Sequence, residues 1–249
     1  MTLNDLGLKS LWMNAPGTLG YSPGRSWDWG APQGAFVTNP ISRAPRAPAG
    51  SRAALSYPGG VLLHSGHPNP GLRRCLRRHL PAWRRSALPV WVHLLANDPL
   101  EAREMARDLE SLDGVAALEV GIPPDADLPL ARSLARAALG ELPLVVSLPL
   151  NLAAPGWLAA LAAVGCAAIA LAAPRGSLVD AGGSIISGRL YGAGLFPQVL
   201  QAVSAHRDLP VPLIAGAGVF SPADGEALLA AGAAALQVDT ALWQPRVGV

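Results

Sequence analysis

The chain has 249 residues, a length that suits one large domain and is common among α/β barrels. Of these residues 51% are hydrophobic and 14% are charged, and the 24 prolines and 27 glycines indicate a compact apolar fold with many turns. The net charge of +2 is too small to favour a nucleic-acid partner. Lys9 is the only lysine and lies near the start of the chain, which argues against Schiff-base chemistry.

Cysteine usage and the N-terminus favour a reducing compartment. Cys75 and Cys166 lie far apart, and neither belongs to a CxxC pair, so the sequence predicts free thiols. The N-terminus lacks a basic segment followed by an apolar one, so a cytoplasmic location is expected. The uncharged stretch 142–174 is divided by prolines and glycines into pieces shorter than the ~20 residues of a membrane helix. We therefore expect buried strands and a short helix there, and no membrane partner.

Apolar runs with strand character alternate with helical segments along the chain. The expected strands span 11–16, 34–38, 88–95, 115–122, 142–148, 167–173, 211–216 and 234–238. The expected helices include 72–85, 98–112, 126–140, 194–205 and 222–231. This alternation predicts an α/β fold over 1–249, a single (β/α)8 TIM barrel domain, with a doubly wound open sheet as the alternative.

The predicted barrel is trimmed in two places. The link between the first two strands, 17–33, is rich in turn formers and too short for an outer helix. About ten residues follow the eighth strand, which leaves little room for the last outer helix. Because an uncovered apolar wall favours contact with another subunit, we expect a homo-oligomer or a partner subunit.

The segment 214–222, IAGAGVFSP, passes from a strand through two glycines into the start of a helix. Glycines let backbone N–H groups approach an anion closely, and the positive end of the helix dipole favours negative charge there. The turn therefore predicts a phosphate site at 216–218. A tight turn that binds nothing explains the same residues as well.

Four segments then stand out in chain order: GAFVTNPISRAPRAPAG at 34–50, GHPNPGL at 66–72, ISGRLYGAGLFPQVLQAV at 186–203 and IAGAGVFSPADGEALLAAGAAALQVDT at 214–240. Together they resemble the dihydroorotate dehydrogenase family, flavin enzymes built on an FMN-binding TIM barrel. The resemblance implies that FMN lies across the barrel mouth and that a small-molecule ligand binds beside it. The cofactor-binding residues that it implies are Ala15, Asn39, Ser147, Gly188, Gly216, Ala217, Gly218, Asp239 and Thr240.

The sequence departs from the family pattern at positions that carry its chemistry. Asn39 and Ser147 replace two lysines that, in the family, stabilise negative charge on the reduced flavin. Pro124 stands in place of the catalytic base, and Gly121 in place of the first asparagine of that segment. Asp239 stands where the family usually has glycine, and its carboxylate would repel a flavin phosphate, so we expect weakened FMN binding.

These departures predict a divergent flavoprotein: an FMN-dependent oxidoreductase acting on an unknown small molecule, or a catalytically silent paralogue. One alternative is an orthodox dihydroorotate dehydrogenase of pyrimidine biosynthesis with a substitute base, for which Asp125 and His67 are candidates. Asp125 has a second interpretation, as part of an acidic loop that caps the following helix. The other alternative is a non-catalytic subunit that binds a partner chain.

The loops after the second strand supply the candidates for ligand binding. The resemblance implies that the substrate-binding residues are Gly66, His67 and Asn69. Arg43 and Arg46 lie in the preceding loop, and a guanidinium group there is suited to bind a ligand carboxylate, with Arg43 as a candidate.

Two other clusters have competing interpretations. His64, His67 and His93 could ligate a metal, but no carboxylate or cysteine follows at a matching spacing, so no metal site is predicted. The helix expected at 72–85 carries six arginines. They indicate a site for an anionic partner, a setting that promotes the Cys75 thiolate, or a solvated face of an outer helix.

Overall fold

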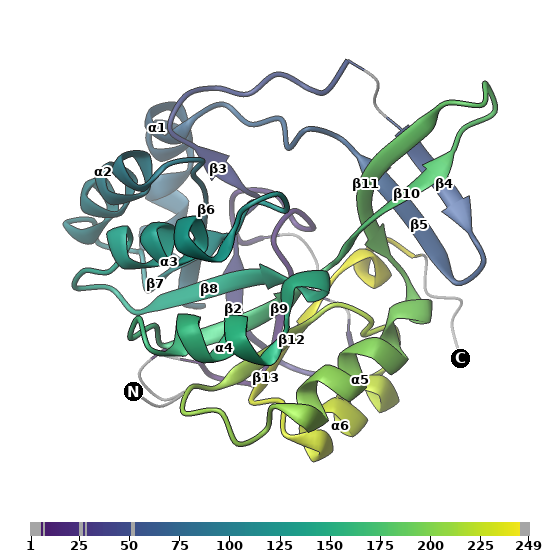
Figure 1. Cartoon of the computed structure of the whole chain (residues 1–249). Helices are drawn as coiled ribbons and strands as arrows, with labels where there is room; N and C mark the ends of the chain where they lie inside the picture. The colour runs from purple at the N-terminus through teal and green to yellow at the C-terminus, as the bar shows by residue number, and fades with distance from the viewer. Residues whose placement is uncertain (1–5, 7, 25–26, 28, 51–52, 245–249) are drawn as a thin grey trace.

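The computed structural model describes residues 6, 8–24, 27, 29–50 and 53–244 (Figure 1). Its centre is a closed barrel of eight parallel strands in the order β2-β1-β13-β12-β9-β8-β7-β6, and pairing of β2 with β6 closes the circle. The strands are β1 (Trp12–Asn14), β2 (Gln33–Val37), β6 (Val90–Leu95), β7 (Ala117–Gly121), β8 (Leu144–Pro149), β9 (Ala168–Ala172), β12 (Leu213–Gly216) and β13 (Ala235–Val238). This closure confirms the predicted TIM barrel and excludes the open sheet.

Helices connect most of the consecutive barrel strands. They are α1 (Leu72–Arg84), α2 (Pro99–Glu110), α3 (Leu128–Ala137), α4 (Pro155–Ala162), α5 (Phe196–Ala205) and α6 (Pro222–Ala231). On the outside of the barrel α3 packs between α2 and α4, and α5 packs against α6 (Figure 1). Their starts are fixed locally: Asp98 and Asp127 accept backbone N–H groups at 2.9 and 2.8 Å, and Ser221 forms a capping box with Asp224.

The described residues after β1 and after β13 form no α-helix before the next barrel strand or the end of the described chain. The described residues between β1 and β2 contain no helix, as predicted. The described chain after β13 forms a 3-10 turn, η4 (Thr240–Trp243). Residues 245–249 lie outside the described part, so the trimming predicted there stays a prediction. A two-residue strand, β3 (Ile41–Ser42), extends the rim beside β6.

The uncharged stretch 142–174 lies within the barrel wall. It folds into β8, the 3-10 turn η2 (Leu150–Leu152), α4 and β9, as the interruptions by proline and glycine predict. All six residues of β8 are buried. None of the described helices is long and apolar enough to cross a membrane.

Alternate strand residues fill the inside of the barrel. Fully buried side chains at its centre include Met13, Val37, Trp91, Val145 and Ile214. Glu119 also points inward, where its Oε1 lies 3.0 Å from His93 Nδ1 and its Oε2 accepts a hydrogen bond from Gln237 Nε2 at 2.7 Å. These contacts satisfy a buried carboxylate and join β6, β7 and β13 across the barrel.

A second sheet, not predicted from the sequence, stands beside the barrel mouth (Figure 1). Its antiparallel strands, in spatial order, are β10 (Arg175–Val179), β11 (Ile185–Tyr191), β5 (Gly60–His64) and β4 (Ala53–Tyr57). The first two belong to the connection between β9 and α5, and the other two to the connection between β3 and α1. The sheet therefore brings two distant segments of the chain together at the mouth.

Candidate functional site

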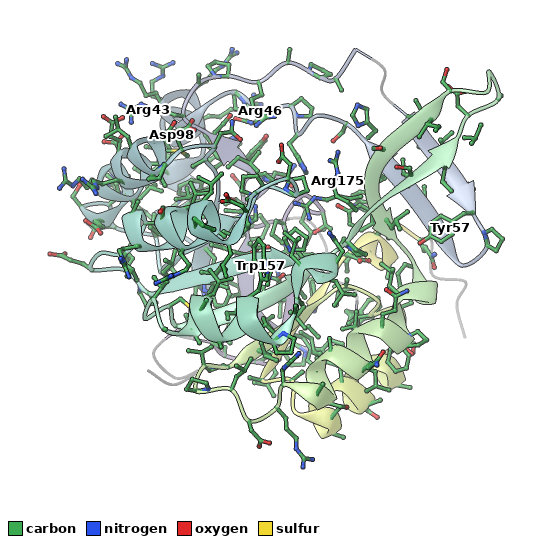
Figure 2. The ribbon with its side chains drawn as sticks, in the orientation of Figure 1. Arg43, Arg46, Tyr57, Asp98, Trp157 and Arg175 are labelled. Carbon is green, nitrogen blue, oxygen red and sulfur yellow. The ribbon has the colours of Figure 1, made fainter. Side chains whose placement is uncertain are left out.

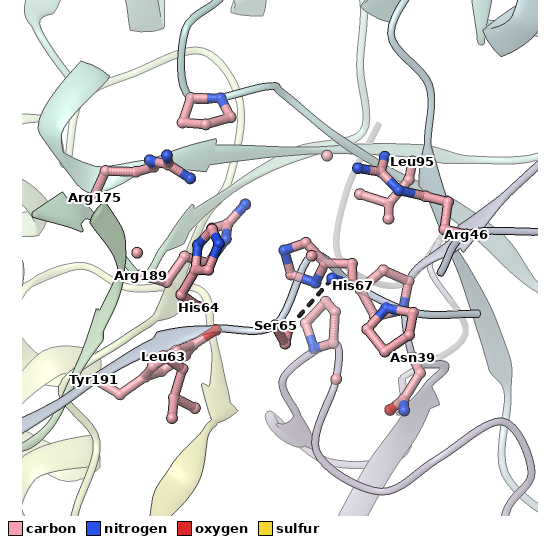
Figure 3. A pocket seen from close by; sticks show the side chains of 18 of the residues that line it. Asn39, Arg46, Leu63, His64, Ser65, His67, Leu95, Arg175, Arg189 and Tyr191 are labelled. Atoms are coloured by element: carbon pink, nitrogen blue, oxygen red, sulfur yellow. Dashed lines mark hydrogen bonds between the residues drawn. The ribbon is translucent and has the colours of Figure 1, made fainter. Parts of the chain in front are cut away.

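A cavity of about 890 Å³ opens at the C-terminal ends of the barrel strands, where TIM barrels bind their ligands. This volume suits a small molecule. One side is formed by segments at the strand ends: 16–18 after β1, 39–40 after β2, 95–97 at β6, 121–125 at β7 and Thr240 after β13. The other side is formed by the second sheet and the loop after β5, with Leu63, His64, residues 65–68, Arg175, Gly188, Arg189 and Tyr191 (Figure 3).

The structure divides the sequence-predicted residues into two groups. Those that line the cavity are Asn39, Gly66, His67, Asp125, Gly188 and Thr240. Those that are buried outside its lining are Ala15, Asn69, Ser147, Gly216, Ala217, Gly218 and Asp239. Asn69 ties loops together, since its Oδ1 accepts a hydrogen bond from Gly71 N at 3.0 Å and its Nδ2 donates to Ser42 Oγ at 2.9 Å.

Arg43, the sequence-predicted partner of a ligand carboxylate, does not line the cavity. It is directed toward α2 instead, where its Nη1 lies 2.9 Å from Glu104 Oε2 and 4.0 Å from Asp108 Oδ2 (Figure 2). Arg46 lines the cavity, and its backbone forms a bridge with Asn69 through hydrogen bonds of 2.9 and 3.2 Å. Of the two arginines in this loop, Arg46 is therefore the one that lines the cavity.

Close packing explains the glycine turn after β12. Gly218 has a φ of 73°, in the left-handed region that favours glycine. A Cβ atom there would lie 2.8 Å from the backbone nitrogen of Phe196, and a Cβ atom on Gly216 would lie 2.9 Å from the carbonyl oxygen of Leu171. Backbone atoms of β9 and of the start of α5 therefore require both glycines, whatever ligand binds beside them.

Asp239 lies beside this turn with its carboxylate buried. The residue is 1% exposed, and its Oδ1 accepts a hydrogen bond from Thr240 Oγ1 at 3.2 Å. Burial raises the pKa of Asp239 to about 7, against the lowering effect of the Thr240 hydroxyl and of the backbone N–H groups of Thr240, Ala241 and Gly218. Among the described residues, Oδ2 has no hydrogen-bond partner of standard geometry.

These contacts decide whether the turn fits a flavin phosphate. The backbone N–H groups of Gly218 and Thr240 lie near enough to the Asp239 carboxylate to lower its pKa, and this is the turn where the family resemblance implies the flavin phosphate. A phosphate in the same place would lie against that carboxylate, and two negative charges ~4 Å apart repel by up to ~4 kcal/mol in a half-exposed site. With Asp239 ionised, the turn as folded therefore disfavours the phosphate of a flavin.

Other positions that depart from the family pattern have structural uses. Asn39 Oδ1 accepts a hydrogen bond from Gly20 N at 3.0 Å and so holds the β1–β2 link at the rim. Gly121 leaves space for His93, because a Cβ atom at 121 would lie 2.8 Å from Nε2 of that imidazole. An asparagine at 121 would therefore displace His93. Pro124 lines the cavity and offers no group that accepts a proton.

Positive charge dominates the cavity. Arg46, Arg175 and Arg189 line it, and Asp125 is the only acidic residue among its described lining residues. His67 lies between these arginines (Figure 3), and burial, together with the nearby positive charges, lowers its pKa to about 3. Sequence reasoning missed Arg175 and Arg189 because it did not predict the sheet that carries them.

Helix α1 does not provide a reactive thiol. Cys75 is buried, and burial raises the pKa of its thiol to about 12, so the interpretation as a thiolate-promoting setting is wrong. Arg73, Arg74, Arg77 and Arg78 are exposed, as on a solvated helix face. Within the described part of the chain, no three His, Cys, Asp or Glu residues lie close enough together to bind a metal ion.

The substitution Asp239→Asn tests the environment of this carboxylate. The pKa of Asp239 is raised from 3.8 to about 7 in the folded protein, so folding favours its protonated form and the penalty of burying the charge grows as the pH rises through this range. We expect Asp239→Asn to be more stable than wild type above pH 7, by up to about 4 kcal/mol, and the difference to shrink toward about pH 4.

Denaturant unfolding of both proteins at several pH values measures this difference. His67, whose lowered pKa gives the opposite slope, is present in both proteins and cancels when they are compared. A stability difference that stays constant from about pH 4 to about pH 8 would contradict the buried, ionisable Asp239.

The comparisons with known proteins agree with the fold. No family model matches the chain. It is 32% identical over 266 residues to the "Dihydroorotate dehydrogenase B (NAD(+)), catalytic subunit" of Pelobacter propionicus, covering 97% of this chain and 87% of the relative. It is 30% identical to the protein of the same name from Trichlorobacter lovleyi, covering 96% of this chain and 86% of the relative.

Among solved structures, the chain is similar in fold to the DHODH of Eimeria tenella in complex with ferulenol. The TM-score is 0.70 at 16% sequence identity, and the match covers 96% of this chain and 80% of that one. Because sequence identity to the bacterial relatives extends over nearly the whole chain, and the barrel matches in three dimensions, this chain belongs to the dihydroorotate dehydrogenase family.

Proposed function

We propose that this chain is a divergent dihydroorotate dehydrogenase-like protein that binds a small molecule at the barrel mouth, holds FMN weakly and does not oxidise dihydroorotate. The observation that carries the proposal is the loop 121–125. It lines the cavity as a catalytic loop should, but it presents Pro124 at the position where the family resemblance places the base.

The substitutions remove two kinds of catalytic contribution. A positioned general base contributes about 10²–10⁴-fold to the rate of a proton abstraction, and Pro124 cannot accept a proton. Fixed positive charge stabilises an anion that forms during the reaction, and Asn39 and Ser147 are neutral at the positions where the resemblance implies lysines. The Oδ1 atom of Asn39 accepts a hydrogen bond from Gly20 N, so this side chain holds the loop between β1 and β2.

The first test is turnover of dihydroorotate. We expect purified protein, supplied with excess FMN and an artificial electron acceptor, to form no orotate above the rate of a protein-free control. The assay follows orotate absorbance, with the relative from Pelobacter propionicus as the positive control. Orotate formation at a rate comparable with that relative would contradict the proposal.

A second candidate function keeps the flavin chemistry and replaces the base. Asp125 favours it, because this carboxylate belongs to the same loop and lines the cavity. Under this alternative the protein oxidises dihydroorotate or another small molecule, and Asp125→Asn abolishes the turnover. Orotate formation that is lost in Asp125→Asn would favour this candidate over the proposal.

The second test is FMN affinity. Wild type should bind FMN at least about tenfold more weakly than Asp239→Gly, because removing the carboxylate frees the backbone donors of Gly218 and Thr240 for the phosphate. Quenching of flavin fluorescence on titration measures both dissociation constants. Asp208→Gly, which removes a 95% exposed carboxylate, is the matched control and should leave the affinity unchanged.

Equal FMN affinity in wild type and Asp239→Gly would show that Asp239 does not control the phosphate position. Riboflavin, which lacks the phosphate, provides an internal comparison. Its affinity should change less than that of FMN in the Asp239→Gly variant.

We also propose that the chain works in an assembly, as a homo-oligomer or with a partner subunit. Val179 and Ile185, cross-strand neighbours on β10 and β11, are 65% and 75% exposed, and β10 is an edge strand of the second sheet. Val179 lies on the edge strand and Ile185 on the strand next to it, and exposed apolar residues at a sheet edge favour pairing with a second copy. A cytoplasmic location remains a prediction.

Light scattering at micromolar concentration tests the assembly. Wild type should have the mass of at least a dimer, and the double variant Val179→Ser with Ile185→Ser should have the mass of a monomer. The exposed Leu100→Ser, on α2, serves as the control for a general loss of apolar surface. A monomeric wild type would contradict self-association through this sheet edge.

A further inference from the structure

Three arginines from separate parts of the chain converge on the cavity. Arg46 belongs to the loop after β3, Arg175 begins β10, and Arg189 lies in β11. Figure 3 shows Arg175 and Arg189 on one side of the cavity and Arg46 on the other, with His67 between them. The Arg189 guanidinium is held in place by a hydrogen bond of 3.1 Å from its Nη1 to the carbonyl oxygen of Ala173.

None of the three has a carboxylate partner within the described residues. The arginine ion pairs found there within 4.0 Å are those of Arg43 and Arg207. Asp125 is the one acidic residue in the described lining, so three guanidinium groups face one carboxylate across the cavity.

The placement of two of these arginines, Arg175 and Arg189, in the second sheet is unfavourable without a ligand. Arg175 and Arg189 are direct cross-strand neighbours, so they share one face of the sheet. Like charges directly opposite each other destabilise a strand pair, and a bound anion reverses the sign of that interaction. Planar guanidinium groups also bind carboxylate and phosphate in bidentate fashion.

His67 supplies an independent sign that this place is shaped for a ligand. It is the only residue other than glycine with a positive φ, 50°, in the described chain. Such strained conformations cluster at ligand sites. Burial first, then the charges of Arg189, His93, Arg46 and Arg175, lower the pKa of His67 to about 3, so its imidazole is neutral near pH 7.

We propose that this cavity binds a small organic anion with two or more negatively charged oxygen groups, a polycarboxylate or a phosphate ester, through Arg46, Arg175 and Arg189. His67 contributes an uncharged hydrogen-bonding group at the centre. The inference rests on the proposed function in placing the ligand of the protein in the mouth cavity, and it adds the chemical class of that ligand.

Calorimetric titration with citrate and with inorganic phosphate, at ionic strength held constant with sodium chloride, tests the proposal. Wild type should bind at least one of the two probes saturably, with one site per chain. The variants Arg175→Gln and Arg189→Gln should each weaken binding at least about tenfold, the effect of losing one charge-assisted hydrogen bond. Tighter citrate binding would indicate a polycarboxylate ligand, and tighter phosphate binding a phosphate ester.

The matched control is Arg74→Gln, which removes an exposed arginine from α1. It should bind both probes as wild type does, and all variants are compared by thermal unfolding to establish that they are folded. Absence of saturable binding to both probes, or equal weakening in Arg74→Gln, would overturn the proposal. Neither result bears on dihydroorotate turnover, so failure here is distinct from failure of the proposed function.

Proton uptake gives a second readout. A bound anion offsets the charges of Arg189, Arg46 and Arg175, so the pKa of His67 should rise toward its usual value. Citrate itself titrates near pH 5, and this contribution is common to both proteins. Citrate binding at about pH 5 should therefore take up more protons, or release fewer, in wild type than in His67→Asn, measured as a dependence of the binding heat on the ionisation enthalpy of the buffer. Equal proton uptake by both proteins would contradict the central position of His67.

Discussion

Closure of the parallel sheet by the β2–β6 pairing is the constraint on which the site depends. Because all eight strands are parallel, their carboxyl ends meet at one rim, and residues from the whole chain reach one cavity. The interior below the rim is closed by packed side chains and by the His93–Glu119–Gln237 contacts. A ligand is thus restricted to the space between the rim and the second sheet.

At this rim the backbone of the family's fold is kept while the side chains that carry its chemistry are replaced. Gly216 and Gly218 are required by the approach of Leu171 and Phe196, so the turn persists without regard to any phosphate. The neighbouring Asp239 is buried and accepts a hydrogen bond from the Thr240 hydroxyl. The cavity at this rim keeps a volume suited to a small molecule, and under the proposed function the replaced side chains change which molecule is favoured.

The barrel was predictable from the sequence because its strands are short, uniformly apolar runs, and capping residues mark several helix starts. The second sheet was not predictable in this way. Its strands β10 and β11 expose several of their residues and contain glycine, serine and arginine, so neither forms a uniformly apolar run. Arg175 and Arg189 were missed for that reason. Whether Arg43 or Arg46 lines the cavity depends on the course of the loop, which does not follow from local sequence. The burial of the Cys75 thiol depends on tertiary packing, which local sequence does not give either.

The central claim is that a buried carboxylate, that of Asp239, weakens flavin binding at the turn where the family resemblance implies the flavin phosphate. The visible absorption spectrum of the protein as purified tests it most directly, because a tightly bound flavin remains through purification and absorbs in the visible range. The account predicts far less than one flavin per chain. A stoichiometric flavin band, retained after gel filtration, would contradict it.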